Sequence, residues 1–310
     1  MFYLPNIKSL AKGTGSFFFP QLRTTHRPLG SVSAPHCYSI FLRHLSLLHK
    51  AGATSLPKVV AELGPGSSMG MGFAALIAGA DKYYALDLID HSQSSLNLDI
   101  FDKLVNMFRK KERIPASGYL SQIFPDLDHY NFPEFLSFQP DANFEKRVVE
   151  IRNDIIARSG VFFEVAAPWM QSHIVKEKSV DWVFSHSVLE HVDDLNGTYR
   201  AIAEWLKPLG YATHLIDFNC HNLTREWNGH WAIADGLWDL TRGKRPYFLN
   251  RSWCSAHLRL AAKNGFETVL EKRFKQYDGL IREQFASQFQ AMNDEDALTK
   301  EIFLVSTLSA

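Results

Sequence analysis

The sequence has few cysteines, no acidic residue in its first 61 positions and no long apolar run. Its three cysteines, Cys37, Cys220 and Cys254, are widely spaced and form no C-x-x-C pair. This argues against a disulfide framework and favours a reducing compartment such as the cytoplasm. No stretch approaches the roughly 18 uncharged apolar residues of a membrane-spanning helix. Because Lys+Arg and Asp+Glu are both 33, net charge gives no case for a nucleic-acid partner.

The basic N-terminal segment admits two interpretations. It carries Lys and Arg residues without any acidic residue before Glu62, a pattern typical of targeting peptides. The stretch "HCYSIFLRHLSLLHKAG", residues 36–52, instead has the spacing of a folded amphipathic helix. We predict an N-terminal helical segment over residues 1–57, followed by one domain over residues 58–310, and keep the targeting segment as the alternative.

From Lys58 onward, short apolar runs alternate with helical patterns, which predicts a doubly wound α/β fold. Strands are expected at 58–63, 82–88, 179–185, 211–218, 267–274 and 301–308. Helices are expected at 69–80, 96–112, 144–160, 194–210 and 255–266. The stretches at about 92–160 and 218–251 interrupt the alternation and are predicted to be insertions. Such insertions often form lids or substrate walls, although they can also pad the core.

The stretch "VVAELGPGSSMGMG", residues 59–72, predicts a strand that ends in a nucleotide-binding turn. Gly64, Gly66 and Gly70 follow a G-x-G-x-x-x-G spacing, one residue longer than the dinucleotide fingerprint. Glu62 precedes the glycines, where a carboxylate suits a cationic ligand better than a pyrophosphate. Asp87, at the end of the next strand, is placed to accept hydrogen bonds from ribose hydroxyls. These residues alone leave an NAD(P)-dependent oxidoreductase as an alternative.

Four blocks resemble, in order, the class I S-adenosylmethionine-dependent methyltransferases over about residues 58–218. They are "AELGPGSSMGMG", "YYALDLID", "SVDWVFSHSVLEHVDDL" and "WLKPLGYATHLIDF". The later blocks "THLID", "EWNGHWAIADGLWDL", "LNRSW" and "NGFE" resemble one bacterial branch of that superfamily. The resemblance implies a Rossmann-like seven-stranded sheet, S-adenosyl-L-methionine as cofactor, and methyl transfer. It implies no particular acceptor and no oligomeric state.

The resemblance also implies a set of cofactor-binding residues. Glu62 and the three glycines match the loop that approaches the methionine part and ribose. Asp87, followed by Leu88, matches the acidic position that binds the ribose hydroxyls. The remaining positions are Ala167 toward the adenine, Ser185, His186, Ser187 and His191 after the fourth strand, and Tyr38 as a cover from the N-terminal helix.

Methyl transfer from a sulfonium requires an aligned nucleophile and the exclusion of water, and a hydroxyl acceptor also needs a base. A base must lie at the carboxyl ends of the strands, beside the cofactor crevice. Histidine suits this task because its unperturbed pKa is about 6.5. We expect His214 or His221 to act as the base with Asp217 orienting it, and we keep His186 as a further candidate.

A bound metal ion is an alternative use of the same histidines. Some methyltransferases with an E-x-x-E-H motif at this segment hold a divalent ion, and Glu190 and His191 resemble its end. Ser187 stands where the first glutamate would be, although His214, Asp217 and His221 at the end of the fifth strand could compensate as nitrogen and oxygen ligands. We predict no metal, because histidines and carboxylates that lie near each other more often form a hydrogen-bond network.

The insertion at 218–251 is dense in Trp, His and Arg and predicts the acceptor site. Aromatic faces flanked by polar groups suit a small polar ring; the candidates are Trp227, His230, Trp231, Asn250 and Arg251. The alternative is that the tryptophans cap the core. We therefore expect a methyltransferase acting on a small polar acceptor such as a saccharide hydroxyl. A second hypothesis is a catalytically silent protein of the same fold, whose basic N-terminus docks an anionic partner.

Overall fold

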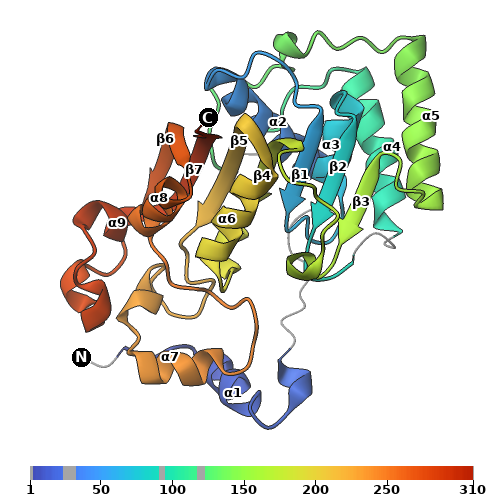
Figure 1. Cartoon of the computed structure of the whole chain (residues 1–310). Helices are drawn as coiled ribbons and strands as arrows, with labels where there is room; N and C mark the ends of the chain where they lie inside the picture. Colours follow the sequence, from blue (N-terminus) through green and yellow to red (C-terminus); the bar gives the residue numbers. More distant parts are fainter. Residues whose placement is uncertain (1–2, 24–32, 91–94, 117–122, 310) are drawn as a thin grey trace.

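The computed structural model describes residues 3–23, 33–90, 95–116 and 123–309, and these form a seven-stranded sheet of order β3-β2-β1-β4-β5-β7-β6 (Figure 1). The N-terminal segment and the insertion at 92–160 therefore lie partly outside the described residues. The strands are β1 (Val59–Leu63), β2 (Lys82–Leu86), β3 (Phe163–Ala166), β4 (Val180–His186), β5 (Leu206–Asp217), β6 (Phe266–Lys275) and β7 (Thr299–Leu308). Strands β1 to β5 are parallel, and β7 is antiparallel to both neighbours. The predicted Rossmann-like α/β fold is confirmed.

Helices cover both faces of the sheet (Figure 1). One hydrophobic cluster joins the sheet to α2 (Ala34–Lys50), α3 (Gly70–Ala78), α4 (Leu96–Arg109) and α5 (Ala142–Ala157). The other joins it to α6 (Leu195–Trp205), α8 (Cys254–Lys263) and α9 (Asp294–Leu298). Strand β4 shows the alternation, since Trp182 and Phe184 enter the first cluster and Val183 the second. Among the described residues, no helix is long and apolar enough to cross a membrane.

Strand β5 begins earlier than the sequence pattern predicts. The helix expected at 194–210 ends at Trp205, and Leu206 already has extended backbone angles and pairs with Val180. Pro208 explains the early end, because a proline lacks an N–H donor and disfavours helical backbone at the preceding residue. After an irregularity with φ of 62° at Leu209, the pairing with β4 resumes at Tyr211.

The N-terminal helix α1 (Ile7–Gly15) packs against α7 (Asp235–Arg242), which belongs to the insertion at 218–251 (Figure 1). Gly13 permits this close approach, because a Cβ there would overlap the backbone of Thr241. The Lys244 backbone N–H also donates to Ser16 Oγ at 2.8 Å. Helix α1 is thus packed onto the insertion at 218–251. This insertion begins directly after the carboxyl end of β5.

Candidate functional site

The segments that follow β1, β2 and β4 leave the sheet at the same edge. Leu63, the last residue of β1, pairs with Leu86 on one side and with Ser185 on the other. The strand order reverses between β1 and β4, because β2 and β3 lie on one side and β4 and β5 on the other. In doubly wound sheets this switch point is where ligands bind.

The predicted glycine loop occupies this switch point. Gly64 and Gly66 have φ of 65° and 77°, a left-handed region that favours glycine. A Cβ on Gly64 would lie 2.6 Å from Val188 Cγ2, so the loop runs directly against the segment after β4. Ser67 Oγ is buried in the loop without a hydrogen-bond partner. The loop thus offers two partly exposed glycines and one unsatisfied polar atom.

Asp87 connects the glycine loop to the end of β2. Its Oδ2 accepts a hydrogen bond from the Gly66 N–H at 3.2 Å, and its Oδ1 accepts one from the Leu88 N–H at 2.6 Å. Each carboxylate oxygen has two lone pairs, so each retains the capacity to accept from a ligand hydroxyl. Ala167 lies close to Asp87, because the Trp169 N–H donates to the Asp87 carbonyl at 2.9 Å.

Glu62 lies behind the loop and is fully buried. Its Oε2 accepts a hydrogen bond from the Tyr83 hydroxyl at 2.7 Å, whereas Oε1 has no partner with hydrogen-bond geometry. Burial raises the pKa of Glu62 to about 8, although the hydrogen bond from Tyr83 opposes this shift. An unsatisfied buried carboxyl oxygen beside the loop is a ready acceptor for a polar ligand.

Two of the other predicted cofactor residues lie in the core. Tyr38 is fully buried, packs edge-on against Phe108, and donates through its hydroxyl to the Glu112 carbonyl at 2.7 Å. The hydroxyl of Ser185 is bonded to His214 Nδ1 at 2.8 Å between β4 and β5. Ser187, by contrast, is at the strand end, where its φ is 55° and its N–H donates to the Leu215 carbonyl.

The structure places two of the predicted catalytic histidines within the sheet, since His214 lies inside β5 and His186 is the last residue of β4. His214 is 2% exposed and faces Tyr199 of α6, and burial lowers its pKa to about 3. His186 lies on the other face of the sheet, where its Nδ1 is 3.2 Å from Nε2 of the buried His44. Burial, with smaller effects of His36 and Arg43, lowers the pKa of His186 to about 3. The sequence does not predict a part for His44, because nothing in its helix indicates this pairing.

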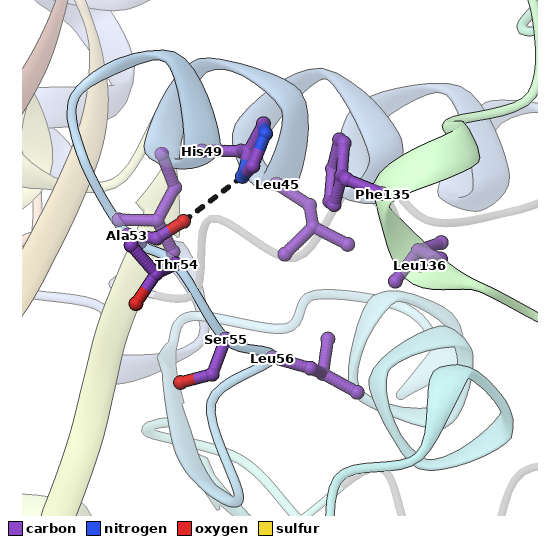
Figure 2. A pocket seen from close by; sticks show the side chains of 9 residues that line it. Leu45, His49, Ala53, Thr54, Ser55, Leu56, Phe135 and Leu136 are labelled. Atoms are coloured by element: carbon purple, nitrogen blue, oxygen red, sulfur yellow. Dashed lines mark hydrogen bonds between the residues drawn. The ribbon is translucent and has the colours of Figure 1, made fainter.

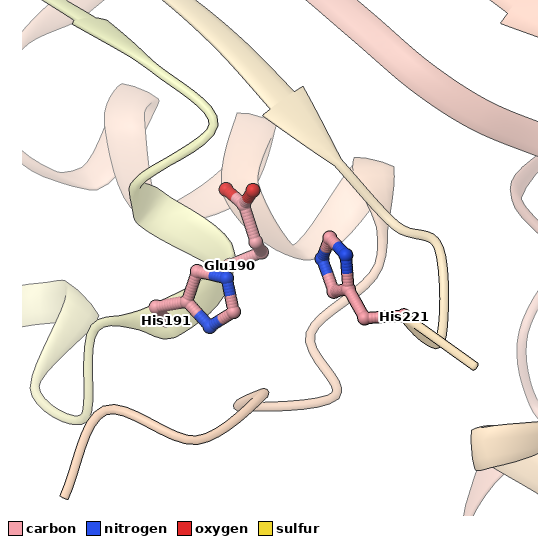
Figure 3. Close-up of side chains that lie close together, drawn as sticks. All are labelled: Glu190, His191 and His221. Atoms are coloured by element: carbon pink, nitrogen blue, oxygen red, sulfur yellow. The ribbon is translucent and has the colours of Figure 1, made fainter. Parts of the chain in front are cut away.

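The structure brings the other candidates together where β4 and β5 end. His221 Nε2 lies 3.9 Å from Asp217 Oδ2, and the rings of His221 and His191 stack with centroids 5.3 Å apart. Glu190 completes this group, since one possible ligand atom from each of Glu190, His191 and His221 lies within 4.8 Å of the others (Figure 3). We call Glu190, His191 and His221 the strand-end cluster. Burial raises the pKa of the neighbouring Asp217.

Most of the residues predicted to bind the acceptor are buried and make packing contacts, although Trp227 also lines a polar pocket at the end of β5. Trp227, His230 and Trp231 are at most 7% exposed. The guanidinium of Arg251 lies over the rings of Trp238 and Phe289 and donates to the Ile233 carbonyl at 2.7 Å. These contacts match the alternative in which the tryptophans cap the core.

Asn250 has a structural role, because its side chain holds the turn that carries Glu190 and His191 of the strand-end cluster. Its Nδ2 donates to the Leu189 carbonyl at 2.7 Å and to the Val192 carbonyl at 2.9 Å. Its backbone N–H donates to the Glu190 carbonyl at 2.8 Å. The "NR" block is thus tied to the segment after β4.

Two pockets lie at opposite ends of the sheet. A polar pocket of about 340 Å³ adjoins the end of β5 and is lined by Asn219, Cys220, Asn222, Thr224, Arg225, Glu226, Trp227, Gln276 and Asp278. A smaller pocket of about 100 Å³ lies at the end of α2 and includes Leu45, Leu56 and Phe135 (Figure 2). Most residues that line the smaller pocket stand between Leu45 and Leu56, just before β1 in the chain. This pocket is therefore near the amino end of β1, whereas the glycine loop follows its carboxyl end. Of the two, the polar pocket adjoins the candidate site.

Residues 144–213, which run from α5 into β5, match a family model described as "Methyltransferase domain". No curated protein matches the sequence.

Similar solved structures include an S-adenosylmethionine dependent methyltransferase from Mesorhizobium loti, at 13% identity and a TM-score of 0.40, with 84% of this chain and 96% of that chain covered. The YcgJ protein from Bacillus subtilis has 13% identity and a TM-score of 0.40, with coverage of 86% and 98%. The [4+2]-cyclase SpnF has 10% identity and a TM-score of 0.42, with coverage of 99% and 98%.

Proposed function

We propose that this chain, whose residues 144–213 match a methyltransferase-domain model, is a class I methyltransferase that transfers a methyl group from S-adenosyl-L-methionine to a small polar acceptor such as a saccharide hydroxyl. One observation carries the proposal. Asp87 binds the glycine loop through the Gly66 N–H at the switch point of the sheet, and its oxygens retain free lone pairs for ribose hydroxyls.

The residues present fit this donor. Gly64 and Gly66 allow a ligand to approach the backbone, and Asp87 would accept from its ribose. Glu62 Oε1 and Ser67 Oγ are buried polar atoms without partners, and a bound ligand with amine and hydroxyl groups would satisfy them. When bound, S-adenosylmethionine supplies an electrophilic methyl group on a sulfonium.

The acceptor side of the site is polar. The pocket at the end of β5 presents Arg225, Asn222 and Asp278, a set that suits the hydroxyls of a saccharide. In the chain, His221 stands between the pocket residues Cys220 and Asn222. Its Nε2 lies 3.9 Å from Asp217 Oδ2. In the absence of a metal ion, we propose that His221 acts as the general base. It would accept the proton that an acceptor hydroxyl loses when its oxygen is methylated.

Calorimetry with S-adenosylhomocysteine, the product form of the donor, tests the cofactor assignment. We expect Asp87→Ala to weaken binding by about tenfold or more, because hydrogen bonds to a charged group contribute about 1.5–3 kcal/mol each. Asp128→Ala is the control, since Asp128 is an exposed carboxylate paired with Lys50 at 2.7 Å. Equal affinity of both variants, or no binding to the unmodified chain, would refute the assignment.

Two further measurements separate this function from its alternatives. Transfer of a labelled methyl group across a panel of saccharides and other polar acceptors distinguishes an enzyme from a silent binding protein, which would bind the donor without turnover. A fluorescence titration with reduced nicotinamide cofactors tests an oxidoreductase. Tight binding of a nicotinamide cofactor combined with no binding of S-adenosylhomocysteine would favour that alternative.

A further inference from the structure

The strand-end cluster collects three metal-ligating side chains from two separate turns. Glu190 and His191 lie in the short 3-10 turn Leu189–His191 after β4, and His221 lies in the turn after β5. Figure 3 shows the two imidazole rings facing a common space, with the Glu190 carboxylate beside it. The ligand atoms that lie within 4.8 Å of one another are therefore supplied by segments about 30 residues apart in sequence.

Glu190 is buried without a partner. It is 2% exposed, and neither carboxylate oxygen has a hydrogen-bond partner of good geometry. A buried carboxylate without a hydrogen-bond partner is costly, and a cation bound beside it would offset that cost.

The neighbouring charges are also predominantly acidic. Asp217 and Glu301 lie beside Glu190, and burial together with Asp217 raises the pKa of Glu301 to about 7. Lys300 acts on Asp217 and Glu301 in the opposite direction, but its Nζ donates to Gln276 Oε1 at 2.6 Å. Two basic side chains act on these carboxyl groups: Lys300, whose Nζ donates to Gln276, and His221, whose Nε2 lies 3.9 Å from Asp217 Oδ2. A bound cation would relieve this crowding.

The two histidines offer the nitrogen ligands. His191 Nδ1 is buried without a partner, while the backbone of Tyr247 forms a hydrogen bond with the ring. In ligating histidines one ring nitrogen binds the metal, and a neighbouring protein group commonly holds the other.

The backbone at His221 is a second sign of a site. Its φ is 50°, a left-handed conformation that is uncommon outside glycine, and its N–H donates to Asn219 Oδ1 at 3.2 Å. Neighbouring Asn222 is also left-handed, with φ of 63°. Such local strain persists where the surrounding structure imposes it, often at ligand sites. Here it directs an imidazole toward a buried, unpartnered carboxylate.

We propose that Glu190, His191 and His221 bind one divalent transition-metal ion, such as Zn²⁺ or Mn²⁺, at the ends of β4 and β5. Two imidazole nitrogens and a carboxylate oxygen form a donor set that suits such ions better than Mg²⁺ or Ca²⁺, which prefer oxygen ligands alone. The sequence predicts no metal, because Ser187 replaces the first glutamate of the E-x-x-E-H motif; the burial of Glu190 and its lack of a hydrogen-bond partner, which the motif does not show, change that expectation. Three protein ligands leave coordination positions open.

The ion has one consequence for the acceptor, which rests on the proposed function. A hydroxyl that coordinated a divalent ion would be a stronger acid and could lose its proton to water, so His221 would serve as a ligand and not as a base. Ion binding itself requires neither donor nor acceptor. Its measurement therefore succeeds or fails independently of methyl transfer.

Calorimetric titration of the full chain, freed of metal with a chelator, tests the site. Zn²⁺ and Mn²⁺ are titrated separately, and Co²⁺ is titrated with visible absorption as the readout, because its spectrum reports nitrogen and oxygen ligation. We expect one ion per chain. Glu190→Gln and His221→Asn should each weaken binding by about 100-fold, at the upper end of what even outer-shell changes cause. Asparagine is chosen at position 221 because it tolerates left-handed backbone.

His129→Gln is the matched control, because His129 is an exposed histidine outside the cluster. It should bind the ions as the unmodified chain does. Thermal melts without metal confirm that each variant folds, and Zn²⁺ should raise the melting temperature of the unmodified chain but not of His221→Asn. The proposal is wrong if no one-to-one binding occurs, if Glu190→Gln and His221→Asn bind like His129→Gln, or if Mg²⁺ binds as tightly as Zn²⁺.

Discussion

The Tyr83 hydroxyl donates a hydrogen bond to Glu62 Oε2 at 2.7 Å, within the layer between the sheet and α3. Gly72 makes this pairing possible, because a Cβ at that position would overlap the Tyr83 ring. The glycine-rich stretch therefore has two structural roles. Gly64 and Gly66 shape the loop, and Gly72 admits the ring that holds the carboxyl group behind it.

Tyr83→Phe should destabilise the protein by about 1–3 kcal/mol, because it removes the Glu62 side chain's hydrogen bond from Tyr83 inside the core. Urea unfolding at neutral pH measures this change. Tyr277→Phe is the control, since Tyr277 is 75% exposed; it should change stability by less than about 0.5 kcal/mol. Equal effects of the two substitutions would show that the buried hydrogen bond contributes nothing.

Gly64→Ala should reduce both stability and donor affinity. Alanine at φ of 65° costs about 1–2 kcal/mol, and its Cβ would also push against Val188, the residue that backs the loop. Gly52→Ala is the control, since Gly52 has φ of 111° but an added Cβ there would meet nothing within 4 Å. The control carries backbone strain without a clash or a ligand site.

Calorimetry with S-adenosylhomocysteine separates the two effects in these glycine variants. Only Gly64→Ala should lose affinity, whereas both variants should unfold at lower urea concentration. If Gly52→Ala weakened binding equally, the glycine loop would have no special part in holding the donor.

The sheet and the glycine loop could be predicted because their signals are local. Apolar runs indicate the strands, and Gly64, Gly66 and Asp87 stand at strand ends, where the fold brings consecutive loops together. The end of α6 was predicted too late, although the signal was present. Pro208 acts on the residue before it and so ends a helix earlier than its own position.

The acceptor side could not be predicted in the same way, because its contacts join distant segments. Asn250 is bound to Leu189 and Val192, and α1 is packed on α7, more than 200 positions away in the chain. The amino-acid composition does not tell which way a side chain points. An insertion rich in tryptophan is therefore equally consistent with a binding site and with a packed core. The unpartnered carboxylate of Glu190 likewise emerges only when burial is known.

Asn250→Ala should destabilise the turn after β4, because the Leu189 and Val192 carbonyls lose their donor. We expect a loss of about 1–3 kcal/mol in the free energy of unfolding. Urea unfolding measures the loss, and faster amide exchange at residues 189–192 would locate it in the turn. Asn153→Ala, at an exposed position of α5, is the control. A change confined to acceptor affinity, with unaltered stability, would instead return Asn250 to the binding role that its sequence position suggested.

His257 should make stability fall in acid. It is fully buried on α8, its Nδ1 lies 3.2 Å from the Tyr199 hydroxyl, and burial together with His214 lowers its pKa to about 3. Between pH 6.5 and about 3 the unfolded chain binds a proton at this histidine and the folded chain does not. The free energy of unfolding therefore decreases as the pH falls, by about 1.4 kcal/mol per pH unit for one proton.

His257→Leu should remove this contribution, so the test compares slopes of stability against pH between about pH 4 and 6. Buried carboxyl groups act in the opposite direction, since the raised pKa of Glu62 makes stability fall as the pH rises from 4.5 toward about 8. The difference between variants cancels that background. Leu258→Ala shortens a partly buried apolar side chain of the same helix and should lower stability without changing the slope. A slope in His257→Leu equal to that of the unmodified chain would mean that His257 gains its proton in the folded state.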